Sequence, residues 1–117
     1  IVRGTTCARI VRLLRSAGAT EVHLRSSAPA FLNPCYYGTD ISSRDSLIAC
    51  KHTTEEMAEI FGADSVGFLP VEEVFNLAKD GKCKGYCAAC FDGDYPTETP
   101  TKAAENKYDR KISESKE

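Results

Sequence analysis

The fold is decided by the first 26 residues, which read IVRGTTCARIVRLLRSAGATEVHLRS. Ile1 and Val2 are strand formers that run into a turn at Gly4. Beyond the turn, apolar side chains recur every three or four residues up to Ala17 and predict a helix, with Gly18 as the C′ residue that follows it. Residues 21–26 then alternate apolar with polar side chains, as a strand does. Strand, turn, helix and strand in this order predict the βαβ unit of a parallel sheet.

The rest of the chain continues the same α/β pattern. We expect a short helix over residues 44–50 and a helix from the capping box at 53–56 to Gly62. A strand over residues 65–69 and a helix from Pro70 to about residue 81 should follow. The prolines at positions 29 and 34 bracket an extended loop.

Composition limits the class of protein. The chain has 117 residues and a net charge of −2, so no field of one sign is present to bind nucleic acid or an anionic membrane. No apolar run reaches the roughly 20 residues of a membrane span, and no secretion signal is present, so we expect a cytoplasmic protein. Because the chain opens at Ile1 without an initiator Met, we expect it to be a fragment.

The turn Arg3-Gly4-Thr5-Thr6 lies between the end of a predicted strand and the start of a helix. Free backbone N–H groups and the helix dipole make such a position an anion site, and Gly4 allows close approach of the backbone. The two hydroxyls can donate to phosphate oxygens. By itself the pattern also fits an ordinary helix start, with Thr5 or Thr6 as the N-cap.

The six cysteines are unevenly spread, since Cys83, Cys87 and Cys90 fall within eight residues. Without a secretion signal, metal or cluster ligation is a better interpretation than a disulfide framework. Cys87 and Cys90 form a C-x-x-C pair, and Cys35 in the proline-flanked loop is suited to be a distant ligand. Such a pair alone is also compatible with zinc, with redox chemistry or with chance. Cys7 and Cys50 fall in predicted helices and receive no role.

Taken in order, these motifs resemble the C-terminal part of the iron–sulfur class of glutamine phosphoribosylpyrophosphate amidotransferases. The resemblance extends over residues 1–98. It rests on segments spread along the chain: the 1–6 turn with its helix and strand, Asn33-Pro34-Cys35-Tyr36-Tyr37-Gly38-Thr39-Asp40, Leu47-Ile48-Ala49, Ile60-Phe61-Gly62-Ala63-Asp64, Phe68-Leu69, Cys87-Ala88-Ala89-Cys90-Phe91 and Tyr95-Pro96-Thr97-Glu98.

The resemblance implies an α/β fold, namely part of a type I phosphoribosyltransferase domain with a Rossmann-like parallel sheet. Residues 1–80 would belong to that domain, 81–98 would form a cluster-binding segment, and 99–117 would be a polar, disordered tail. The complete enzyme would form 5-phosphoribosylamine from phosphoribosylpyrophosphate and glutamine-derived ammonia, the first committed step of purine synthesis. The fragment alone would be inactive, because the glutaminase domain and the carboxylates that bind ribose and assist Mg²⁺ would precede Ile1.

The resemblance also assigns residues. Arg3, Gly4, Thr5 and Thr6 would hold the 5′-phosphate, and none of them would act as a general acid or base. Cys35, Cys87 and Cys90 would ligate a [4Fe–4S] cluster, with the fourth cysteine outside this chain and Cys83 excluded. Purine nucleotides would inhibit the enzyme, which would be a homo-tetramer. The alternative to an enzyme fragment is an autonomous, non-catalytic metal-binding module.

Overall fold

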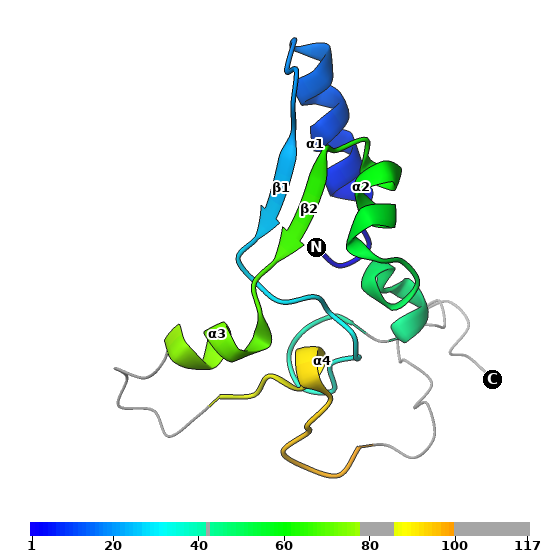
Figure 1. The fold of residues 1–117 in the computed structure, drawn as a ribbon. Helices are drawn as coiled ribbons and strands as arrows, with labels where there is room; N and C mark the ends of the chain where they lie inside the picture. Colours follow the sequence, from blue (N-terminus) through cyan, green and yellow to red (C-terminus); the bar gives the residue numbers. More distant parts are fainter. Residues whose placement is uncertain (42, 78–85, 100–117) are drawn as a thin grey trace, which may run out of the picture.

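The computed structural model describes residues 1–41, 43–77 and 86–99 (Figure 1). The described part is an α/β arrangement whose elements follow the order α1 (Thr5–Ser16), β1 (His23–Ser26), the 3₁₀ turns η1 (Arg44–Ser46) and η2 (Ile48–Cys50), α2 (Thr54–Phe61), β2 (Ser65–Phe68), α3 (Val71–Leu77) and α4 (Ala89–Asp92). In this part of the chain, no helix is long and apolar enough to cross a membrane.

Strands β1 and β2 pair in parallel, with His23 opposite Ser65 and Ser26 opposite Phe68. Successive side chains of a strand point to opposite faces. Leu24, Val66 and Phe68 therefore pack together against the core on one face. On the other face, the Ser65 hydroxyl lies 2.8 Å from His23 Nδ1 and accepts a hydrogen bond of 2.9 Å from Arg25. The alternation of apolar and polar residues in the strands thus gives the sheet one apolar face and one polar face.

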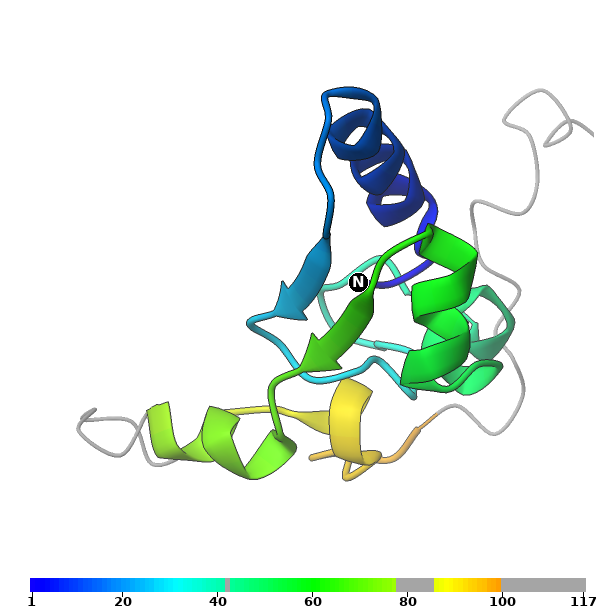
Figure 2. The same ribbon diagram turned by 45° about the horizontal axis from the view of Figure 1, so that its top comes forward.

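Helices α1 and α2 lie on the same side of this sheet (Figures 1 and 2). Between the helices and the strands is one cluster of buried apolar side chains, made of Val11, Val22, Ile48, Met57 and Phe61. Helix α1 contributes only Val11 as a buried residue, and Ile10 and Leu14 of its predicted apolar face remain 46% and 44% exposed. Helix α2 supplies more of the core, since Met57, Ala58 and Phe61 are all buried.

The start of α2 confirms the predicted capping box. The Thr53 hydroxyl accepts a hydrogen bond from the Glu56 N–H at 3.3 Å, and the Glu56 carboxylate accepts one from the Thr53 N–H at 3.0 Å. Gly62 ends the helix in the left-handed conformation, with φ of 73°. The helix therefore has both ends satisfied by residues that the sequence makes recognisable.

Two predicted elements are wrong in detail. Ile1 and Val2 are not part of the sheet, and the Val2 carbonyl instead accepts a hydrogen bond from Ile48 N–H at 3.0 Å. The expected helix over 44–50 is two 3₁₀ turns separated by Leu47, whose backbone is extended. Leu47 is fully buried, so the residue that interrupts the predicted helix is a core residue.

Three other predictions fall outside the ranges described above. They are the end of the helix that begins after Pro70, the environment of Cys83, and nearly all of the 99–117 tail. They remain predictions.

Candidate functional site

The start of α1 is the turn that the sequence predicts as an anion site, called the anion turn below. Gly4, not Thr5 or Thr6, is the N-cap residue, and no side chain caps the helix. The predicted threonine cap is therefore wrong, because Thr5 and Thr6 already lie inside the first turn. With no hydroxyl or carboxylate bonded there, the N–H groups of the first turn remain available to a bound anion.

Gly4 has two reasons to be glycine. Its φ is 82°, which is a left-handed conformation that other residues rarely adopt. A Cβ atom at this position would lie 2.5 Å from Phe61 Cε1 and 2.9 Å from Ile48 Cδ1. The turn therefore packs directly against core side chains, and this contact fixes the position of its N–H groups.

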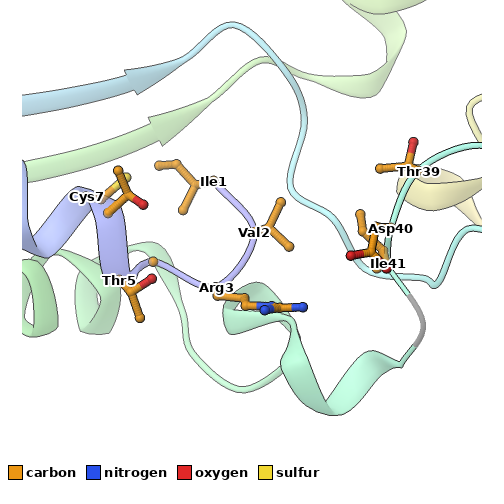
Figure 3. Close-up of a pocket in the computed structure, with 10 residues that line it drawn as sticks. Ile1, Val2, Arg3, Thr5, Cys7, Thr39, Asp40 and Ile41 are labelled. Atoms are coloured by element: carbon orange, nitrogen blue, oxygen red, sulfur yellow. The ribbon is translucent and has the colours of Figure 1, made fainter. Parts of the chain in front are cut away.

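A pocket of about 540 Å³ opens over this turn (Figure 3). Its walls come from two segments distant in the sequence, residues 1–7 and residues 39–41. Gly4 is buried, whereas Arg3, Thr5 and Thr6 are exposed and so can reach a ligand. The structure therefore brings all four predicted phosphate-binding residues to one pocket.

Three lining residues had no predicted role: Thr39, Asp40 and Ile41. Thr39 and Asp40 belong to the segment 33–40, which contributed to the resemblance without a role of its own, and Ile41 follows that segment. The Gly38-Thr39-Asp40 run carries turn residues and a carboxylate, and this was the available signal. Only the fold places that run opposite the anion turn.

Cys35 lies at the other end of the same loop. Its N–H donates to the Ile41 carbonyl at 2.9 Å, and its Sγ accepts a hydrogen bond from Thr39 N–H at 3.4 Å. Partial burial raises the pKa of Cys35, but hydrogen bonds from the backbone of Tyr37, Thr39 and Gly38 outweigh it, and the pKa falls from 9.0 to about 7. The loop therefore favours the thiolate, which is the form that binds metals.

Cys90 lies in α4, which packs beside this loop. The Cys90 carbonyl accepts hydrogen bonds from Leu32 N–H at 2.9 Å and Asn33 N–H at 3.1 Å. Burial raises the pKa of the Cys90 thiol, and the neighbouring charges of Cys35 and Cys87 raise it further. The two hydrogen bonds from residues 32 and 33 place α4 beside the loop that carries Cys35.

The donor set fits a thiolate-bound group in its chemistry. Cys35 and Cys90 are half-buried, Cys87 is exposed, and all three are free thiols. Backbone N–H groups directed at sulfur, as at Cys35, are the hydrogen bonds that tune iron–sulfur clusters. Over the described ranges, however, no three His, Cys, Asp or Glu side chains are arranged as a set that could hold one metal ion.

Both sites lie within a stretch that known proteins share. A curated relative from Archaeoglobus fulgidus is 45% identical over 106 residues, and one from Bacillus subtilis is 50% identical over 102 residues. Both carry the name amidophosphoribosyltransferase. The chain is similar to part of an amidophosphoribosyltransferase. The match to the Archaeoglobus fulgidus protein covers 90% of this chain and 23% of that protein. The match to the Bacillus subtilis protein covers 84% of this chain and 21% of that protein. No protein-family model matches the chain.

Solved structures agree with the amidophosphoribosyltransferase relatives. The glutamine phosphoribosylpyrophosphate amidotransferase of Bacillus subtilis, complexed with ADP and GMP, superimposes with a TM-score of 0.73 at 48% identity. It covers 84% of this chain, which spans 22% of that protein. A structure described as the allosteric regulatory enzyme of purine biosynthesis gives a TM-score of 0.76 at 45% identity, covering 88% of this chain and 23% of its own. At such identity the α/β fold is that of the matching part of these enzymes.

Proposed function

We propose that this chain is part of the phosphoribosyltransferase portion of an amidophosphoribosyltransferase. The complete enzyme would make 5-phosphoribosylamine from phosphoribosylpyrophosphate and ammonia released from glutamine, as the first committed step of purine synthesis. The observation that carries the proposal is the uncapped start of α1 at the floor of a pocket, within a chain 45–50% identical to enzymes of that name.

The chain's own residues would bind and position the substrate. Backbone N–H groups at Thr5 and Thr6, together with their hydroxyls, would hold the 5′-phosphate. The Arg3 guanidinium adds positive charge at the rim, and Gly4 keeps the backbone low enough for contact. These groups would bind and orient the substrate, and none of them would act as a general acid or base. Mg²⁺ would be held mainly by residues outside this chain.

The substrate assignment is tested with Thr6→Val in the complete enzyme. Loss of a charge-assisted hydrogen bond to phosphate should weaken phosphoribosylpyrophosphate binding by about tenfold. Glutaminase activity measured without phosphoribosylpyrophosphate should be unchanged. Thr20→Val, at an exposed position away from the pocket, is the matched control. Equal substrate affinity in Thr6→Val and the control would remove this turn from the binding site.

We propose that Cys35, Cys87 and Cys90 ligate a [4Fe–4S] cluster whose fourth ligand lies outside this chain. The proposal is supported by the shared location of the three thiols and by the N–H groups directed at Cys35 Sγ. When bound, the cluster would supply a structural cross-link between the 31–41 loop and the C-terminal segment. The residues of this chain would hold the thiolates and orient them.

The cluster is tested by serine substitution in the complete polypeptide, purified without oxygen. Cys35→Ser, Cys87→Ser and Cys90→Ser should each lose the broad visible absorbance of the cluster. Cys50→Ser is the control within the described chain, and Cys83→Ser should also be tolerated. Retention of the absorbance in Cys35→Ser and its loss in Cys83→Ser would overturn this ligand set.

Regulation, assembly and location are further parts of the proposal. The Bacillus subtilis structure is complexed with ADP and GMP, which supports binding of purine nucleotides by the complete enzyme, and we propose that they inhibit it. We expect a homo-tetramer, to be measured by analytical ultracentrifugation. Free thiols at Cys7, Cys35, Cys50, Cys87 and Cys90 fit a reducing compartment, and we assign the enzyme to the cytoplasm.

A further inference from the structure

The peptide group that joins Pro34 to Cys35 is held at both of its polar atoms. Its oxygen, the Pro34 carbonyl, accepts a hydrogen bond of 2.6 Å from the Tyr95 hydroxyl. Its N–H, which belongs to Cys35, donates to the Ile41 carbonyl at 2.9 Å. Because a peptide group is planar, these two bonds fix the orientation of the whole unit and therefore the position of the Cys35 Cα.

The sulfur of Cys35 is restrained separately. Thr39 N–H donates to Sγ at 3.4 Å, so the side chain is directed by its own loop. Of the three contacts that fix Cys35, only the Tyr95 bond comes from another part of the chain. The other two connect residues within the segment 35–41.

Tyr95 also connects the loop to the helix that carries Cys90. Tyr95 follows α4 by three residues, and its ring lies 5.2 Å from the Tyr36 ring. The Phe91 ring, which follows Cys90 directly in the chain, packs 5.0 Å from the Phe31 ring.

We propose that Tyr95 is a positioning residue for the thiolate site, holding Cys35 at a fixed distance from Cys90 through its hydrogen bond to the Pro34 carbonyl. The inference rests on the cluster proposed above. It extends that proposal by assigning a residue that is not a ligand. In the metal-free protein, the Tyr95 hydroxyl ties the backbone beside Cys35 to the segment that follows Cys90.

The chain offers a matched control in Tyr37. Its hydroxyl also joins the loop to the C-terminal segment, lying 2.9 Å from Thr97 Oγ1. That bond is between two exposed side chains, whereas the Tyr95 bond reaches the backbone beside a ligand. Tyr95→Phe and Tyr37→Phe each remove one hydroxyl group, and each hydroxyl makes one hydrogen bond between the loop and the C-terminal segment. Only Tyr95→Phe removes a hydrogen bond from the peptide group that joins Pro34 to Cys35.

The first experiment measures cluster retention in the complete, cluster-loaded polypeptide under anaerobic conditions. An iron chelator is added, and the decay of visible absorbance is followed. Tyr95→Phe should lose the cluster about five to ten times faster than the wild type, a factor typical of one hydrogen bond. Tyr37→Phe should stay within about twofold. Equal rates for the two variants, at equal resistance to urea, would overturn the inference.

The second experiment does not depend on a cluster. The metal-free polypeptide is treated with dibromobimane, which bridges neighbouring thiols, and bridged peptides are identified by mass spectrometry. The yield of the Cys35–Cys90 bridge should fall several-fold in Tyr95→Phe and remain unchanged in Tyr37→Phe. An unchanged yield in both variants would refute the positioning role. If the wild type takes up no cluster but bridging still falls in Tyr95→Phe, the cluster proposal is rejected and the positioning role of Tyr95 is retained.

Discussion

Two regions of this molecule are held together by different forces. The helical core, made of α1, α2 and the two strands, has a buried cluster to which both helices and the adjoining chain contribute. The thiol region, residues 31–41 and 86–99, has Ile41, Ala88 and Ala89 as its buried apolar residues and depends on backbone hydrogen bonds and two aromatic pairs. Such a region gains from a cross-link, because little apolar surface is removed from water.

Their contacts with the pocket differ as well. The helical core supplies the anion turn, which Phe61 and Ile48 support from below. The thiol region supplies the opposite wall through residues 39–41. The candidate pocket thus has one wall fixed by packing and another fixed by a hydrogen-bonded loop. Perturbing each region separately should therefore have different consequences for stability and for binding.

Gly4→Ala should give the largest effect and should act on the helical core. The new Cβ would lie 2.5 Å from Phe61 in a backbone conformation that alanine avoids, so we expect a loss of about 4 kcal/mol in unfolding free energy. Gly18→Ala shares the positive φ but meets no atom within 4 Å, and should cost about 1 kcal/mol. Urea denaturation compares the two. Equal losses would mean that the contact with Phe61 does not support the turn.

Met57→Ala should come next, with a loss of about 3 kcal/mol from the cavity that it leaves in the core. Met57 is 2% exposed, whereas Ile60 on the same helix is 49% exposed. Ile60→Ala should therefore cost less than about 1 kcal/mol. Denaturation curves followed by circular dichroism distinguish them. A large loss in Ile60→Ala would show that α2 is buried against another surface in the complete protein.

Phe91→Leu tests the thiol region. It removes a ring packed 5.0 Å from Phe31, and we expect a loss of about 1 kcal/mol. The loss should appear as faster proteolysis within residues 86–99, while the helical core keeps its melting temperature. A matching fall in the melting temperature of the core would contradict the separation of the two regions.

Asp64→Asn should have the smallest effect, and one that depends on pH. The pKa of Asp64 is lowered mainly by the Val22 N–H, with slight burial opposing it and the Arg15 charge adding to it. A lowered pKa stabilises the fold above the carboxyl's unfolded pKa and stops doing so as pH falls through the folded pKa. The variant should therefore be less stable than the wild type at pH 7, and the difference should shrink below about pH 4. A difference that is constant between pH 7 and pH 3 would exclude the charge of Asp64 as its cause.

Local sequence patterns predicted many of the secondary structure elements and their ends. The capping box at Thr53 and Glu56, the left-handed Gly18 just after α1 and the positions of the two strands all follow from signals within a few residues of each other. Predictions failed where a tertiary contact overrode the local preference. The backbone of Val2 bonds to Ile48 instead of a strand, and burial of Leu47 divides the helix expected over 44–50.

The sequence by itself determined the α/β class, the anion turn at residues 3–6 and the cysteine candidates, because each depends on residue type and short spacing. Only the tertiary structure decided that Thr39 and Asp40 face that turn, that Gly4 rests on Phe61 and that Tyr95 holds the Pro34 carbonyl. Those contacts join residues about 35 to 60 positions apart. No local pattern encodes them, because the packing of the whole chain sets which distant segments meet.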